Sequence, residues 1–223
     1  MSGNNELNNK NQFYKKLLVE GNDDRNVCYH LLRSHYIDID RHGIEIVAKN
    51  GVGNLLQDLA VELSTSSLTS LGIVVDADED IAVRWQSLRD ILLKVGYSAA
   101  PADPDLEGTI IYESNKPTIG IWIMPNNELP GMLEHFCRFL VPYDDCLWDH
   151  AEHVVQQVMQ VDCRFPQPHL MKAQIHSWLA WQNEPGKPLG QAITKKFLDS
   201  QAPYAQQFIL WIRRLFELYY DRL

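Results

Sequence analysis

The 223-residue sequence lacks the patterns that mark several common protein classes. Its cysteines, Cys28, Cys137, Cys146 and Cys163, include no C-x-x-C pair, so zinc-ribbon and thioredoxin motifs are unsupported. We expect reduced thiols, as in a cytosolic protein. No apolar run approaches the ~18 residues of a membrane span, and the polar, Asn-rich start has no apolar signal-peptide core. The expected location is therefore cytoplasmic, without membrane association.

Positive charge is also scarce, with 20 Lys and Arg against 29 Asp and Glu and a net charge of -9. This balance argues against a bulk electrostatic binder of nucleic acid and against a polybasic membrane-surface protein. The charge is uneven: residues 1–170 carry more acidic than basic side chains, whereas residues 171–223 carry more basic than acidic ones. A hydrophobic fraction of 45% supplies material for a proper core and excludes a disordered chain.

Apolar runs and helical spacings alternate over the first hundred residues, which predicts a β-α-β-α-β-α order and a mostly parallel sheet flanked by helices. Two further strands are expected at 109–112 and 118–124. The alternating elements are three strands, expected at 14–20, 44–48 and 71–75, and three helices, expected within 21–36 and over about 55–63 and 81–95.

From Pro130 onward the pattern is helical and is interrupted by prolines. The chain therefore divides into a disordered tail at 1–12, an α/β domain at 13–128 and a helical C-terminal region at 129–223. Within that last region the spacing predicts five helices, near 130–140, 146–161, 169–183, 189–199 and 204–221.

Acidic residues follow two of the expected strands. Glu20 ends the run LLVE, while Asp76 and Asp78 follow GIVV, with Asp80 two residues further on. Residues i and i+2 of an extended chain point the same way, so Asp76 and Asp78 are expected to face one point, joined by Glu20. Such a cluster is costly unless a cation neutralises it, and Mg²⁺ or Mn²⁺ suits oxygen ligands. The alternative is surface acid, with Asp78 or Asp80 capping the next helix.

Together, VEGNDD and VVDADED resemble the two hallmark motifs of the toprim superfamily, which includes topoisomerases, bacterial primases and OLD-family nucleases. The resemblance covers roughly residues 13–125 and implies a Rossmann-like fold. It also implies that Glu20, Asp76 and Asp78 bind Mg²⁺ and that Glu20 acts as a general acid or base. A closer resemblance, carried by IWIMPNNELPGMLEHF and KAQIHSWLAWQNEPGKPLGQAIT, is to a small bacterial toprim-type family of unassigned function.

The OLD-like branch implies further residues. An acid about four residues after the Glu would be Asp24, a downstream Glu would be Glu134, and a lysine that assists at the scissile phosphate would be Lys172. A solvated lysine is the competing interpretation of Lys172. OLD-like nucleases also carry an ATPase domain, whereas this sequence has no GxxxxGK[ST] motif, so any ATPase is expected to be a separate partner.

The segment KNGVGN leads from the second expected strand into a helix. Its residues Lys49, Gly51 and Gly53 are candidates for binding a substrate phosphate. The spacing matches neither a P-loop nor a dinucleotide fingerprint, and an ordinary strand-to-helix turn is the favoured alternative.

These observations predict a Mg²⁺-dependent toprim-type nuclease, or phosphodiester hydrolase, acting on nucleic acid. The alternative is a non-catalytic Mg²⁺-binding regulatory or scaffold module. Because the chain is acidic, affinity for nucleic acid is expected to depend on divalent metal, on the basic C-terminal helices or on a partner. Assembly into a homo-oligomer is left open.

Overall fold

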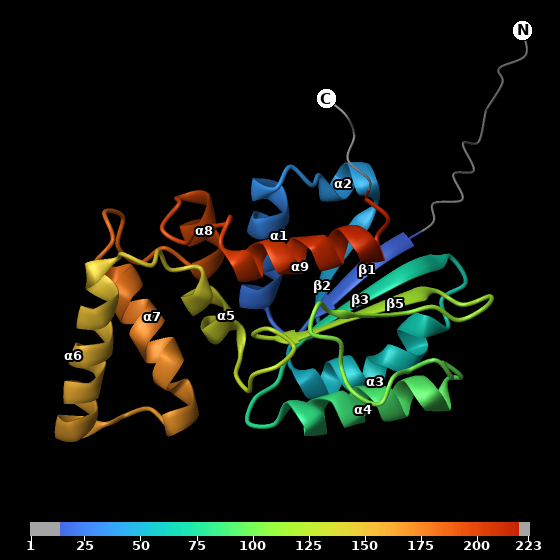
Figure 1. Ribbon diagram of the computed structural model, residues 1–223, viewed down its shortest axis with the longest axis horizontal. Coiled ribbons are helices and arrows are strands. Elements are labelled where there is room, and N and C mark those ends of the chain that lie inside the picture. Colours follow the sequence, from blue (N-terminus) through green and yellow to red (C-terminus); the bar gives the residue numbers. More distant parts are fainter. Residues whose placement is uncertain (1–13, 219–223) are drawn as a thin grey trace, which may run out of the picture.

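The computed structural model describes residues 14–218, and its centre is a five-stranded sheet in the order β2-β1-β3-β5-β4 (Figure 1). All neighbouring strands run parallel except β4 and β5, which are antiparallel. The strands are β1 (Tyr14–Val19), β2 (Ile44–Ala48), β3 (Leu68–Asp76), β4 (Thr109–Ile111) and β5 (Thr118–Met124). The predicted α/β class with a mostly parallel sheet is confirmed.

Helices cover both faces of this sheet, with α3 and α4 on one face and α1 and α9 on the other (Figure 1). Helices α6 and α7 lie side by side beyond one end of the sheet. The helices are α1 (Asn22–Ser34), α2 (Ile39–His42), α3 (Val52–Leu63), α4 (Ile81–Lys94), α5 (Leu133–Phe139), α6 (Cys146–Asp162), α7 (Leu170–Ala180), α8 (Leu189–Thr194) and α9 (Pro203–Leu215), with a short 3-10 turn at Gln167–His169.

The two-residue period of β1 divides its side chains between the two faces. Leu17 and Val19 pack in the core beneath α1 and α9, whereas Leu18 packs in the core beneath α3 and α4. All three side chains are fully buried. The sequence of a strand that is buried on both faces is a continuous apolar run, as LLV is in β1.

Helix α9 completes one layer of the α/β sandwich. Gly72 of β3 and Gly120 of β5 lie opposite each other in the sheet. A Cβ added at Gly120 would lie 2.6 Å from a methyl carbon of Leu215 in α9, so the paired glycines make room for that side chain. Phe208 and Trp211 of α9 pack in the same core as the strands. The helical region after residue 128 therefore shares a hydrophobic core with the sheet.

Most expected elements occur near their predicted places. Helix α3 begins three residues earlier than predicted, at Val52, and β3 extends beyond both ends of 71–75. Helix α2 was not predicted. Helix α8 ends at Thr194 rather than at 199, and α9 ends at Leu215. The tail at 1–12 and residues 219–221 of the last predicted helix lie outside the described residues. Among residues 14–218, no helix is long and apolar enough to span a membrane.

Candidate metal and substrate site

The carboxyl ends of the adjacent strands β1 and β3 bring two acidic residues into contact. Val19 of β1 is in register with Val74 of β3, so Glu20 lies next to the end of β3. The Glu20 Oε1 atom accepts a hydrogen bond of 2.9 Å from the backbone N–H of Asp76. Parallel pairing of these strands therefore places Glu20 and Asp76 together, as the sequence predicted.

Asp24 joins them from the first turn of α1. Gly21 caps this helix, and its backbone N–H donates a 3.0 Å hydrogen bond to Asp24 Oδ2. The other oxygen, Oδ1, is buried and has no hydrogen-bond partner among the described residues. A buried acceptor without a donor is costly in a folded protein and calls for an explanation.

Glu134, in the first turn of α5, is the fourth acidic side chain of this group. The neighbouring backbone N–H of Leu133 donates a 3.0 Å hydrogen bond to Asp76 Oδ1, which ties α5 to the end of β3. Glu134 is buried, and its Oε1 forms a 3.0 Å ion pair with Lys172 Nζ of α7. We call Glu20, Asp24, Asp76 and Glu134 the carboxylate cluster.

Burial and mutual repulsion make negative charge unfavourable in the carboxylate cluster. Burial, followed by the neighbouring carboxylates, raises the pKa of Asp76 to about 9. The same effects raise the pKa of Asp24 to about 7. Burial also raises the pKa of Glu20. The cluster therefore carries an unneutralised electrostatic cost that a bound cation would remove.

The residues of the carboxylate cluster suit a hard divalent cation, although they are not already arranged around one point. No group of three or more His, Cys, Asp or Glu side chains between residues 14 and 218 is placed so that it could hold a metal ion. Each cluster residue has one oxygen held by a protein donor. The buried, unpartnered oxygen of Asp24 is the observation that fits binding of a cation.

Asp78 lies at the edge of the cluster, close enough for its negative charge to contribute to the raised pKa of Asp76 and of Glu20. Strand β3 ends at Asp76, and Asp78 has a left-handed backbone with φ 54° and forms an isolated bridge with Gly131. The alternation of an extended strand therefore does not reach Asp78, which corrects the argument from i, i+2 spacing. Its carboxylate is half-exposed and forms an ion pair with Arg84.

Asp80 caps α4. Its Oδ1 accepts hydrogen bonds from the backbone N–H groups of Ala82, at 2.8 Å, and Val83, at 3.2 Å. These contacts satisfy two free donors of the first helical turn, as expected of an N-cap aspartate. The structure thus gives Asp80 the capping role that was the alternative to metal binding.

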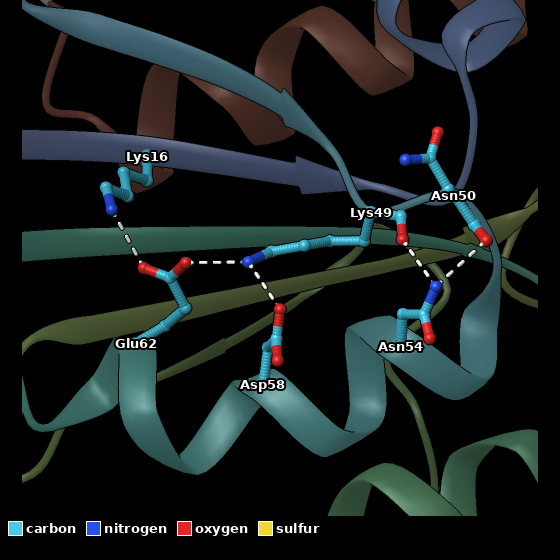
Figure 2. Close-up of polar contacts among 6 residues, drawn as sticks. All are labelled: Lys16, Lys49, Asn50, Asn54, Asp58 and Glu62. Carbon is cyan, nitrogen blue, oxygen red and sulfur yellow. Dashed lines mark hydrogen bonds and ion pairs between the residues drawn. The ribbon is translucent and has the colours of Figure 1, made fainter.

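The Lys49 ammonium is held by two acidic side chains of α3, as Figure 2 shows. Its Nζ donates to Asp58 at 3.0 Å and to Glu62 at 2.8 Å, and Glu62 also pairs with Lys16. The side-chain amide of Asn54 donates to the backbone carbonyl of Lys49.

The glycines of the same segment form a strand-to-helix turn. Gly51 caps α3 with φ 116°, and its N–H donates to the backbone carbonyl of Glu20 at 2.9 Å. Gly53 lies in the first turn of α3. The Lys49 ammonium and the Gly51 amide, two of the predicted phosphate donors, are thus already engaged within the protein.

A groove of about 870 Å³ opens beside the cluster, between the first turns of α4 and α7. Sequence reasoning did not identify three polar side chains that line it: Arg84, His135 and Gln174. Arg84 donates from Nε to the backbone carbonyl of Asp76 at 2.7 Å, in addition to its ion pair with Asp78. Arg84 lies one helical turn after the capping Asp80 and faces back toward the strand end. This spacing is the sequence feature from which its place at the site could have been predicted.

Comparison with known proteins gives a family and a set of similar structures. Residues 14–217 match the model of a family described as a protein of unknown function (DUF3226). The C-terminal region of the Burkholderia pseudomallei OLD protein is 12% identical, with a TM-score of 0.49, covering 91% of this chain and 98% of that one. For the C-terminal region of the Xanthomonas campestris pv. campestris OLD protein the values are 15%, 0.46, 92% and 96%. No curated protein matches the chain.

Proposed function

The chain belongs to the family DUF3226, whose description assigns no function. From the geometry of the site we propose that the protein is a Mg²⁺-dependent phosphodiester hydrolase acting on nucleic acid. The proposal combines the carboxylate cluster with the resemblance of VEG and DAD to the toprim motifs. Mn²⁺ is the expected substitute for Mg²⁺ because both prefer oxygen ligands.

The carboxylate cluster carries this proposal. Asp24 and Glu134 are buried and Glu20 and Asp76 are partly buried, yet among these four Lys172 forms an ion pair with Glu134 alone. Asp24 keeps one oxygen without a donor, and the pKa of Asp76 is raised to about 9. Such unfavourable arrangements are typical of functional sites, where the strain is tolerated because a ligand relieves it.

Glu20, Asp24 and Asp76 are the proposed metal-binding residues, with Glu134 completing their site. A bound divalent metal would supply Lewis-acid polarisation of a phosphate and a water of lowered pKa. Asp78 holds Arg84 at the rim, where this pair borders the space that a substrate would enter. Asp78 would bind the metal directly only after its ion pair with Arg84 is broken.

Lys172 is the proposed catalytic cation. Its hydrogen bond to Glu134 raises the pKa of the Lys172 ammonium, so the side chain stays charged at neutral pH. The Lys172 side chain is half-exposed at the first turn of α7, so a phosphate oxygen can approach it. Its role would be to balance negative charge that develops on the phosphate during cleavage.

Cleavage assays test the proposal. Plasmid, single-stranded DNA and structured RNA are incubated with the protein in Mg²⁺, Mn²⁺ or a chelator. We expect cleavage of at least one substrate with either metal and none with the chelator. Asp76→Asn should abolish cleavage, while Asp103→Asn, a matched change in an exposed loop, should preserve it.

The assay is repeated with any ATPase encoded by a neighbouring gene, because a partner is part of the expectation. Absence of cleavage under all these conditions, together with retained metal binding, would favour a non-catalytic Mg²⁺-binding module. Cleavage that persists in the chelator or in Asp76→Asn would contradict the proposed role of the carboxylate cluster.

A further inference from the structure

We propose that the groove between α4 and α7 binds an unpaired nucleotide of the substrate strand, next to the phosphate that is cleaved. This inference rests on the proposed function, and it restricts the substrate to single-stranded or locally unpaired nucleic acid. The groove holds about 870 Å³, which lies within the range of pockets that enclose small ligands.

Continuity with the carboxylate cluster is the first argument. Asp78 and Arg84 form one wall of the groove, and the Arg84 guanidinium donates to the backbone carbonyl of Asp76. Met171, on the opposite wall, precedes Lys172, whose ammonium pairs with Glu134. A chain whose phosphate lies at the cluster would therefore pass directly into the groove.

The walls of the groove are mainly apolar, which favours an unpaired base over a duplex. Val83 projects from α4, and Leu170 and Met171 from α7, with Pro130 and Met132 between the two helices. A duplex keeps its base faces stacked inside and presents sugars and phosphates. An unpaired base exposes a flat apolar face, which such side chains can cover.

Gln174 indicates that the occupant also has polar edges. The residue is only 6% exposed and lines the groove, yet its side chain forms no hydrogen bond with another side chain or backbone group between residues 14 and 218. An amide offers two N–H donors and one carbonyl acceptor, a set that base edges complement. An apolar peptide side chain would leave all three unsatisfied, at a cost in binding.

Arg84 supplies the positive charge that a nucleotide requires. Its Nε and one Nη are engaged by Asp76 and Asp78, while the second Nη forms no hydrogen bond with a described residue. An arginine has five N–H donors in a planar fork, so a phosphate oxygen can be bound without breaking the existing contacts. The groove thus offers apolar walls for the face of a base, Gln174 for its polar edge and Arg84 for a phosphate.

Fluorescence anisotropy tests this inference with a labelled single-stranded 12-mer and a hairpin duplex of the same sequence. Binding is measured in Ca²⁺, which occupies oxygen sites, and hydrolysis is measured separately in Mg²⁺. We expect the single strand to bind at least about tenfold more tightly than the duplex. Gln174→Met, which keeps the volume and removes the amide, should weaken single-strand binding about tenfold, a loss typical of a paired amide.

Matched variants test whether a loss of binding comes from the groove and not from the type of substitution or from loss of folding. Gln156→Met makes the same change on the exposed face of α6 and should leave binding unchanged. Val83→Asp places a negative charge at an exposed position of the groove, where folding should tolerate it, and should also weaken binding. Val158→Asp adds the same charge on α6, away from the groove, and should have little effect. Thermal melts establish that each variant is folded.

The outcomes separate this inference from the proposed function. Equal or tighter binding of the duplex, or unchanged binding by both groove variants, would overturn the inference even if cleavage is observed. A single-strand preference that depends on Gln174, without hydrolysis of any substrate in Mg²⁺, would overturn the proposed function and retain the groove. Absence of both binding and hydrolysis would overturn both.

Discussion

Replacing Asp24 with asparagine should stabilise the metal-free protein and weaken its binding of divalent metal. The asparagine side chain is nearly isosteric with aspartate, and its carbonyl oxygen can still accept the hydrogen bond from Gly21. Its N–H group would replace the buried, unpartnered oxygen and would face the negative side chains of Glu20 and Glu134, which both raise the Asp24 pKa. The substitution thus supplies the donor that the site lacks.

The magnitude follows from the raised pKa of Asp24. A pKa of about 7 in the fold, against 3.8 in the unfolded chain, makes ionised Asp24 ~4 kcal/mol less favourable in the folded protein. Because the folded-state pKa is the higher one, the cost is absent below pH 3.8, grows as the pH rises, and is complete above about pH 7. Allowing for relaxation around the charge, we expect a gain of roughly 2–4 kcal/mol at pH 8.

Thermal unfolding in a chelator at pH 5 and pH 8 measures this gain. For a chain of this size, that gain corresponds to a Tm increase of roughly 4–16 °C. At pH 5 the increase should be less than half as large, because folded wild-type Asp24 is protonated there. Added Mg²⁺ at pH 8 should raise the Tm of the wild type far more than that of Asp24→Asn.

Asp23→Asn is the matched control, because Asp23 is the exposed neighbour in the same helical turn. It should change neither the Tm at pH 8 nor the response to Mg²⁺ by a comparable amount. The reasoning would be refuted if Asp24→Asn were no more stable than the wild type at pH 8. A gain of equal size at pH 5 and pH 8 would refute the electrostatic explanation in particular.

Three further substitutions test separate parts of the site and the fold. Lys172→Met should lower the cleavage rate by roughly 10²-fold in protein that is still folded, since a half-exposed cation that stabilises transition-state charge is lost, and it should also lower the Tm because Glu134 is left buried without its ion-pair partner; a rate near that of the wild type would refute its role. Asp80→Ala should cost about 1 kcal/mol of unfolding free energy in denaturant titrations through loss of the α4 cap, yet leave metal affinity by calorimetry unchanged. Gly120→Ala should cost roughly 1–3 kcal/mol because its methyl group would clash with Leu215, and an unchanged unfolding midpoint would contradict that packing.

Sequence patterns were sufficient for the sheet and for the acids directly at its strand ends. Glu20 and Asp76 were predictable as neighbours because an apolar run precedes each and parallel strands end at the same edge. Asp24 and Glu134 came from the toprim resemblance, and the structure places both beside Asp76, as the repulsion that raises the Asp76 pKa indicates.

The remaining features depend on contacts that periodicity does not encode. Asp78 leaves the strand direction because its backbone turns left-handed and pairs with Gly131. Lys49 is engaged because α3 presents Asp58 and Glu62 one turn apart. From the sequence, Gln174 is an ordinary polar residue of a C-terminal helix, and only the packing of α7 against α5 and α6 shows that it lines the groove.

The most direct test of the central claim is the anomalous diffraction of crystals soaked in Mn²⁺. We expect a peak at the carboxyl ends of β1 and β3, within about 2–2.6 Å of oxygens from Glu20, Asp24 and Asp76. We expect side-chain rotations to bring these oxygens around the ion, and Oδ1 of Asp24 to become one of its ligands. Full metal occupancy elsewhere on the protein, with no peak among these three carboxylates, would contradict the account.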